Sequence, residues 1–168
     1  MIRRVLEAEG RRSEVVYSDC QRYRYSLTRC WDADAGRLLF VMLNPSQADE
    51  RRNDPTVARC EARARAMGFG AYRVVNIFAW RATDPRDLRA ADQPVGPAND
   101  AALLEGAAWA SHILAAWGAH GAHRGRGAEV RALLAACGRP LLHLGLTKGG
   151  EPRHPLYIAA ARPAEPWN

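Results

Sequence analysis

The chain has 168 residues, of which 48% are hydrophobic and 25% are charged, and its formal net charge is +6. This length and composition are typical of one globular domain, so we expect a single domain over residues 1–168, with a core from about residue 14 to about residue 160. No apolar run is long enough to span a membrane, and residues 1–6 lack the apolar stretch of a signal peptide. We therefore expect a cytoplasmic location and no membrane partner.

The charge and the cysteines limit the classes of ligand. Lys148 is the only lysine, so the basic side chains are almost all arginine, which suits recognition of phosphates and bases. The positive charge permits nucleic acid or a nucleotide as partner, although a bias toward arginine and alanine also arises from genome composition. The four cysteines form no CxxC pair and match no zinc spacing. We expect neither a metal nor another cofactor.

The first predicted elements lie before residue 32. The first twelve residues are charged and unpatterned, which predicts a frayed start. Residues 14–17 and 23–31 are rich in strand formers, and the second segment alternates apolar with polar residues. These two segments predict an N-terminal antiparallel hairpin, followed by a turn at residues 32–36.

The next stretch, Leu38–Leu43, is a continuous apolar run. Such a run predicts a strand buried on both faces, as at the centre of a parallel sheet. Proline has no N–H to donate to a ladder, so Pro45 ends the strand and leaves Asn44 and Ser46 at its carboxyl end. The plainer interpretation is that Asn-Pro only makes a turn.

Strands and helices then alternate along the chain. Asp54 and Pro55 predict the cap and first position of a helix that ends near Met67. Further strands are predicted at residues 73–79, 112–117 and 140–145, further helices at residues 99–110 and 128–137, and an irregular connection at residues 80–97. This order predicts an α/β fold: a three-layer α/β/α domain with a four-stranded parallel sheet preceded by the hairpin.

Ligands of open α/β sheets bind at the carboxyl ends of the strands. Asn44, Asn76, Trp117 and His154 are each at or shortly after a predicted strand end. An amide pairs with the edge of a base, and a histidine supplies a proton or stabilises a developing anion. Each also has a plainer interpretation: Asn76 as a core amide, and His154, like His120 and His123, as an exposed loop residue.

Common catalytic and phosphate-binding motifs are missing from the sequence. The chain has no GxxxxGK[ST], no GxGxxG after the first strand of the parallel series, no GxSxG and no HExxH. These absences argue against a P-loop, a dinucleotide fold, a nucleophile elbow and a zincin.

Two resemblances follow from the motifs. Residues 42–49, 53–56, 75–79, 81–83, 99–100 and 145–157 together resemble the bacterial and archaeal family DUF1643, over roughly residues 23–160. That resemblance names a family and implies no activity. More remotely, the order of motifs is similar to the uracil-DNA glycosylase superfamily, whose mismatch-specific branch ends its first strand in Gly-Ile-Asn-Pro-Gly. The segment from Leu43 to Ser46 is similar to that motif, and the segment from His154 to Leu156 is similar to a later His-Pro-Ser.

The second resemblance implies a uracil-DNA glycosylase-like fold, in which Asn44 positions a water and Asn76 reads the base edge. Trp117-Gly118 matches the Trp-Gly or Leu-Gly dipeptide that the superfamily carries on its third strand. Ser46 and Leu156 replace the motif glycine and serine. Asp49, or Asp54 if it is not only a helix cap, stands near enough in sequence to activate water. The predicted catalytic residues are Asn44, Asp49 and His154. The predicted substrate-binding residues are Pro45, Ser46, Asn76, Phe78, Trp117, Gly118 and Tyr157, and the predicted phosphate-binding residues are Arg81, Lys148 and Arg153.

Three functions follow as hypotheses. The first is a DNA glycosylase-like enzyme that hydrolyses an N-glycosidic bond in nucleic acid or a related nucleotide, through an oxocarbenium-like state and, in a duplex, a flipped base. The second is a non-catalytic nucleotide-binding or modified-base-binding domain of the same fold. The third, an interaction domain that contacts protein, has no specific sequence support.

Overall fold

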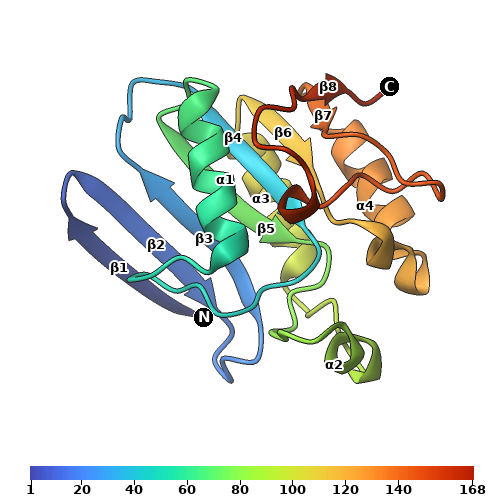
Figure 1. The fold of residues 1–168 in the computed structure, drawn as a ribbon. Helices are drawn as coiled ribbons and strands as arrows, with labels where there is room; N and C mark the ends of the chain where they lie inside the picture. The colour runs from blue at the N-terminus through green and yellow to red at the C-terminus, as the bar shows by residue number, and fades with distance from the viewer.

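The computed structural model describes residues 1–168 and contains one eight-stranded mixed sheet with helices on both of its faces (Figure 1). The strands are β1 (Ile2–Ala8), β2 (Arg11–Tyr17), β3 (Arg24–Cys30), β4 (Arg37–Met42), β5 (Ala71–Asn76), β6 (His112–Ala115), β7 (Leu141–His143) and β8 (Glu165–Pro166). The helices are α1 (Pro55–Ala66), α2 (Pro85–Ala90), α3 (Asn99–Trp109) and α4 (Arg126–Ala135), with short 3-10 helices η1 (Ala119–Gly125) and η2 (Pro155–Tyr157).

The strand order is β1-β2-β3-β5-β4-β6-β7-β8. The four neighbours β5, β4, β6 and β7 run parallel, whereas four of the seven neighbouring pairs in the whole sheet are antiparallel. The α/β class is therefore confirmed. The finer prediction, a sheet of only four parallel strands in a uracil-DNA glycosylase-like fold, does not fit this eight-stranded mixed sheet. The predicted antiparallel pairing of residues 14–17 with residues 23–31 is confirmed by β2 and β3. This hairpin is part of the sheet and does not merely precede it: β3 pairs with β5, placing Leu27 opposite Val74, and this extends the sheet.

The N-terminus also differs from the prediction. The first residues form β1, an edge strand paired along its length with β2, rather than a frayed start. Most side chains of β1 are exposed: Val5 is 45% exposed, and only Ile2, which packs against the core cluster on the α1 face, and Leu6 are partly buried. A strand of this kind carries no period-two apolar pattern, because that pattern arises from burial of one face.

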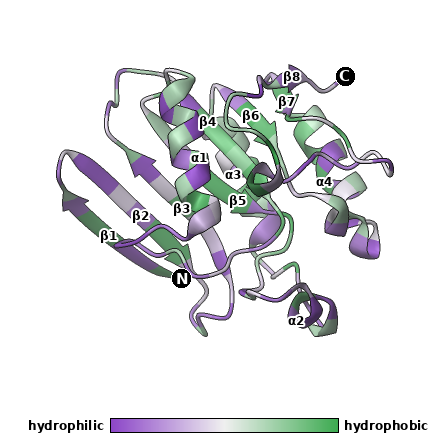
Figure 2. Cartoon of the chain, in the orientation of Figure 1, coloured by the Kyte–Doolittle hydropathy of each residue, from purple (hydrophilic) through white to green (hydrophobic).

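Alternation along β4 divides the core between the two faces of the sheet. Leu38, Phe40 and Met42 pack with Val57, Cys60 and Ala64 of α1 in one apolar cluster. Leu39 and Val41 pack with residues of α3 and α4 in a second cluster on the other face. Figure 1 shows this arrangement, with α1 on one side of the sheet and α3 on the other, and Figure 2 shows the central strands in the hydrophobic colours.

Capping decides where two helices begin. Asp54 accepts a hydrogen bond from the N–H of Val57 at 2.9 Å, and Pro55 occupies the first turn of α1, as predicted. Asp84 and Pro85 repeat this arrangement at α2, within the segment that was predicted to be irregular. No helix of the protein has both the length and the apolar character that crossing a membrane requires.

Candidate functional site

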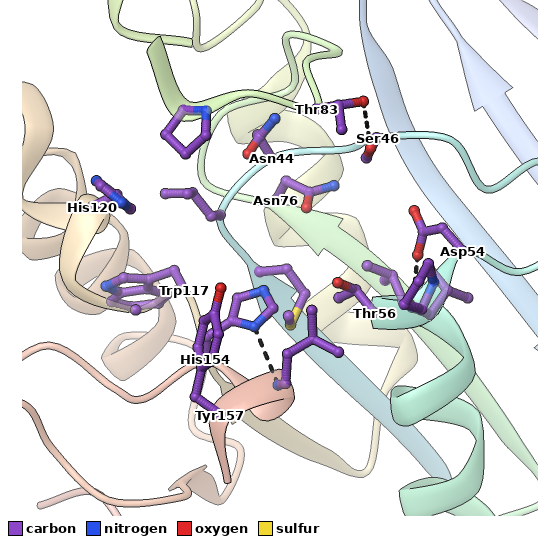
Figure 3. Close-up of a pocket in the computed structure, with 18 of the residues that line it drawn as sticks. Asn44, Ser46, Asp54, Thr56, Asn76, Thr83, Trp117, His120, His154 and Tyr157 are labelled. Atoms are coloured by element: carbon purple, nitrogen blue, oxygen red, sulfur yellow. Dashed lines mark hydrogen bonds between the residues drawn. The ribbon is translucent and has the colours of Figure 1, made fainter. Parts of the chain in front are cut away.

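A cavity of about 650 Å³ lies where the parallel strands end, next to the N-terminus of α1 and to η2 (Figure 3). Its volume falls within the usual range for small-molecule sites. Three polar side chains from separate segments, Asn44, Asn76 and His154, line it together. The lining also includes Arg24, Ser46, Asp54, Thr56, Thr83, Trp117, Gly118, His120, Thr147, Arg153 and Tyr157.

Asn44 lies in the turn directly after β4. Its Nδ2 donates to the carbonyl of Ala82 at 2.7 Å and to the carbonyl of Pro45 at 3.2 Å. The N–H of Ala82 donates in turn to the carbonyl of Pro45 at 3.0 Å, so the turn after β4 is joined to the segment after β5. These bonds fix the amide orientation and leave Oδ1 as an acceptor that receives no hydrogen bond from the chain.

Asn76 is the last residue of β5 and is only 1% exposed. Neither its Nδ2 nor its Oδ1 has a hydrogen-bond partner, and each atom exposes less than 1 Å². Its backbone is held firmly, because Asn99 of α3 donates from Nδ2 to the carbonyls of Asn76 at 2.8 Å and Ile77 at 3.2 Å. The buried Arg126 also donates to the carbonyl of Ile77, at 2.8 Å. An amide that is held in place yet unpartnered is costly unless a ligand completes it.

His154 precedes η2, and its Nδ1 accepts from the N–H of Leu156 at 3.3 Å. Burial lowers the pKa of His154 to about 4, against a smaller opposing effect of Asp54. The imidazole is therefore neutral at pH 7, and its proton sits on Nε2 because Nδ1 acts as the acceptor. The site thus contains a neutral imidazole with one N–H free to donate.

Gly118 supports His154 from the end of the third parallel strand. Its φ of +77° and ψ of −176° belong to a region that only glycine adopts readily. A Cβ on this residue would lie 3.4 Å from the Cβ of His154. The N–H of Gly118 also donates to the carbonyl of Pro152 at 2.7 Å, which joins the loop after β6 to the segment that carries the histidine.

Aromatic side chains form one wall of the site. Trp117 is 1% exposed, its Nε1 donates to Glu151, and it lines the cavity. Tyr157 is 84% exposed and lies with its ring centroid 5.7 Å from that of His154. His120 stands at the mouth, where Arg89 of α2 donates to its Nδ1 at 2.9 Å. Figure 3 shows these side chains on the side of the cavity opposite Thr56 and Asp54.

Asp54 contributes the one carboxylate that lines the cavity. Both of its oxygens are engaged by backbone N–H groups: Oδ1 by Val57 at 2.9 Å, and Oδ2 by Gln47 and Ala48 at 3.2 Å each. Its main role is therefore to cap α1 and to hold the preceding loop. Close by, the hydroxyls of Ser46 and Thr83 are hydrogen-bonded to each other at 2.9 Å.

Five of the residues predicted for the site do not line the cavity. Asp49 closes a turn, accepting from the N–H groups of Arg51 and Arg52 at 2.8 Å each. Phe78 is fully buried in the core cluster on the α3 face, where no base can stack on it. The remaining three are Pro45, which is buried, and Arg81 and Lys148, which are exposed.

These placements change the set of candidate residues. Arg81 donates to the carbonyl of Gln21 at 2.9 Å and stacks over Tyr17, so it contacts β2 and the connection between β2 and β3. Arg153 does line the cavity, at its exposed rim. Sequence reasoning missed Arg24 and Thr83 and assigned His120 to an exposed loop. Thr83 belongs to the segment 81–83, one of those that resemble the DUF1643 family, and this was the sequence signal that could have identified it.

A protein-family model described as "Protein of unknown function (DUF1643)" matches residues 24–156, which is well over half of the chain. No curated protein and no solved structure gives a significant match. The similarity of motifs to the uracil-DNA glycosylase superfamily is therefore not confirmed by any match. The structure contains no group of three or more histidine, cysteine, aspartate or glutamate side chains arranged to hold a metal ion.

Proposed function

The chain belongs to the DUF1643 family, and we propose that its cavity binds a nucleobase, in nucleic acid or in a related nucleotide, and promotes hydrolysis of the N-glycosidic bond. One observation carries the proposal: Asn44, Asn76 and His154, from three separate segments, line a single cavity. The proposal rests on this site and on the motif resemblance, and not on a match of folds.

Recognition of the base is assigned to Asn76. A side-chain amide offers one donor and one acceptor side by side, which complements the edge of a pyrimidine or purine. Both atoms of this amide are without partners in the chain, while its backbone is fixed by Asn99. The buried ring of Trp117 and the exposed ring of Tyr157 supply aromatic surface against which a base can pack.

The chemistry is assigned to Asn44 and His154. In the proposed step, the oxygen of water bonds to the anomeric carbon, the carbon–nitrogen bond breaks, and the electron pair leaves with the base. Oδ1 of Asn44 accepts a hydrogen bond from the attacking water, because Nδ2 is committed to the carbonyl of Ala82. The Nε2–H of the neutral His154 donates to the departing base as negative charge develops on it. The water's second proton passes to solvent.

The alternative is a binding domain that does not cleave. The observation that favours it is the state of Asp54, whose oxygens are occupied by three backbone N–H groups. No other aspartate or glutamate lines the cavity, so the site has no unoccupied carboxylate to serve as general base. This alternative shares the assignment of Asn76 and differs in the roles of Asn44 and His154, which would then contact the ligand without promoting cleavage.

The test is a base-release assay followed by chromatography of the freed bases. Single-stranded and duplex oligonucleotides that contain uracil, hypoxanthine or alkylated bases are incubated with the wild type, and nucleoside monophosphates are tested in parallel. Asn44→Ala and His154→Gln are compared with Gln93→Ala, which removes an exposed amide outside the cavity. We expect release by the wild type and by Gln93→Ala, and a loss of at least about a hundredfold in the two cavity variants.

Equilibrium binding separates the alternatives. Release that is unchanged in both cavity variants would refute the catalytic assignment. Binding of a base-containing ligand without any release, weakened by Asn76→Ala, would establish the binding domain instead. Absence of both release and binding across all these substrates would refute the proposed function.

A further inference from the structure

A β-bulge brings an arginine into the cavity wall. Along β2 and β3, Val16 pairs with Ser26, but the next residue, Tyr17, pairs with Arg24. Tyr25 is therefore an extra residue in β3, and such a bulge redirects the side chains that follow it. As a result Arg24, which regular alternation places on the face opposite Tyr17 and Leu27, lines the cavity and is only 2% exposed.

The guanidinium of Arg24 has few partners for a buried cation. Its Nη1 donates to the carbonyl of Ala48 at 2.9 Å, while its Nε is buried without any partner. No carboxylate lies within ion-pair distance of it. Burial lowers the pKa of Arg24 to about 10, so the group still carries its charge at pH 7. A buried charge without a counterion is expensive, and an anionic ligand would reduce that cost.

The other charged groups of the cavity do not neutralise the positive charge of Arg24. Asp54 is the one carboxylate of the cavity and raises the pKa of Arg24 against the larger effect of burial, but three backbone N–H groups already share its charge. His154 is neutral at pH 7, and Arg153 at the rim adds a second positive charge. The inner wall is thus positive at Arg24 and lies in the same cavity as the unpartnered amide of Asn76.

We infer that Arg24 and Asn76 form an anion-recognition subsite, and that the ligand of this cavity is a nucleobase or nucleotide carrying a carboxylate or a phosphate. A guanidinium binds both groups through charge-assisted hydrogen bonds, often in pairs. This inference rests on the proposed function for the nucleobase portion of the ligand. The preference for an anion stands on the geometry of Arg24 alone.

The experiment is isothermal titration calorimetry at constant ionic strength with four probes: uridine, uridine monophosphate, orotate and inorganic phosphate. Uridine is neutral, and the other three distinguish a phosphate from a carboxylate. We expect at least one of the two anionic base derivatives to bind about tenfold or more tightly than uridine, the gain from one charge-assisted interaction. The wild type alone answers this part, so the result does not depend on a variant that folds.

Two variants of Arg24 and one control variant test whether Arg24 causes the preference for the anion. Arg24→Met is expected to remove the preference for the anion, and Arg24→Lys to retain part of it. Arg29→Met is the matched control, because Arg29 is also fully buried and also holds the loop after β4, donating to the carbonyls of Asp49 and Arg52. It does not line the cavity, so the preference is expected to survive in this variant.

The outcomes separate this inference from the proposed function. Equal binding of uridine and its monophosphate, with orotate no tighter, would overturn the anion subsite and leave base binding standing. An equal loss of preference in Arg24→Met and Arg29→Met would overturn the role of Arg24. Binding of phosphate without binding of any base derivative would support the subsite and argue against a uracil-type ligand, and no binding of any probe would overturn the inference.

Discussion

Replacement of Asn76 by leucine is expected to make the protein more stable and to abolish ligand binding. The amide is 1% exposed, and its two polar atoms have no partner, so the folded state bears the cost of their lost hydration. Leucine has a similar forked shape, and the register partner of this residue is the apolar Met42.

The expected gain follows from the cost of unpartnered groups. Leaving a buried donor or acceptor unsatisfied costs about 1–3 kcal/mol, and removing it without strain recovers part of that amount. We therefore expect the free energy of unfolding to rise by about 1–2 kcal/mol in Asn76→Leu, measured by urea denaturation at pH 7. The melting temperature should rise by about 2–4 °C for each kcal/mol in a chain of this size.

Asn99→Leu provides the matched control. Asn99 is also a fully buried amide and its Oδ1 has no partner, but its Nδ2 donates to two backbone carbonyls, at 2.8 Å and 3.2 Å. Its replacement should lower the free energy of unfolding by about 1–3 kcal/mol. The same substitution is thus expected to have opposite signs at two positions. Destabilisation by Asn76→Leu of the same size as in Asn99→Leu would show that the amide of Asn76 is already satisfied, and would refute the argument that it awaits a ligand.

Three further predictions concern the groups around the cavity. Asp54→Ala removes the acceptor for three backbone N–H groups and should lower stability by about 0.5–2 kcal/mol in urea denaturation, with Asp54→Asn losing less. Gly118→Ala should lower stability by about 1–3 kcal/mol because of its backbone conformation, and should shift the NMR signals of His154, which its new methyl group would contact. Because burial lowers the pKa of His154 to about 4, the unfolded chain binds a proton at higher pH than the folded one does. Stability should therefore fall as the pH drops from about 6.5 toward about 4, by up to about 3 kcal/mol, and His154→Gln should lose less over this range; an NMR titration of His154 near pH 6.5 would contradict this.

The central strands and the main helices were predictable because their signals are local. Leu38–Leu43 is apolar at every position, which only burial on both faces explains, and most of this stretch forms β4. Asp54 followed by Pro55 marks the start of α1 through a hydrogen bond within four residues. Asp84 and Pro85 carry the same signal for α2, which the prolines of the surrounding segment obscured.

Strand pairing was not predictable, because it depends on contacts between distant segments. The contact of β3 with β5 joins residues 27 and 74, and nothing in either segment alone specifies that partner. In the edge strand β1 the apolar residues Ile2, Val5 and Leu6 do not alternate regularly with polar ones, so the strand pattern is hidden. The bulge at Tyr25 likewise leaves no mark, since residues 23–31 alternate in sequence as if the strand were regular. Regular alternation places Arg24 on the face opposite Leu27, so nothing in the sequence marks it as a cavity residue.

The site was predicted in part for a clear physical reason. Residues at the ends of parallel strands share one edge of the sheet whatever the loops do, and so Asn44, Asn76 and Trp117 were brought together as expected. Residues farther from a strand end follow the local path of the chain. Asp49 accepts a hydrogen bond from the N–H of Arg51 within its own loop, and Phe78 is buried in the core cluster on the α3 face. Strand periodicity does not extend to either position.

The cavity concentrates features that oppose folding, and this has a measurable consequence. It holds an unpartnered amide, a buried arginine that makes no ion pair and a histidine kept neutral by burial. A ligand that satisfies these groups binds the folded state only, so it must stabilise the protein by mass action, by about 2.7 kcal/mol at a concentration one hundred times its Kd. In a chain of this size that corresponds to a rise in melting temperature of roughly 5–11 °C. A thermal-shift screen of nucleobases, nucleosides and nucleotides should therefore identify the ligand class without an assay for turnover. In Asn76→Leu the same ligand should give no shift, although the variant begins from a higher melting temperature; an undiminished shift in that variant would place the ligand elsewhere on the protein.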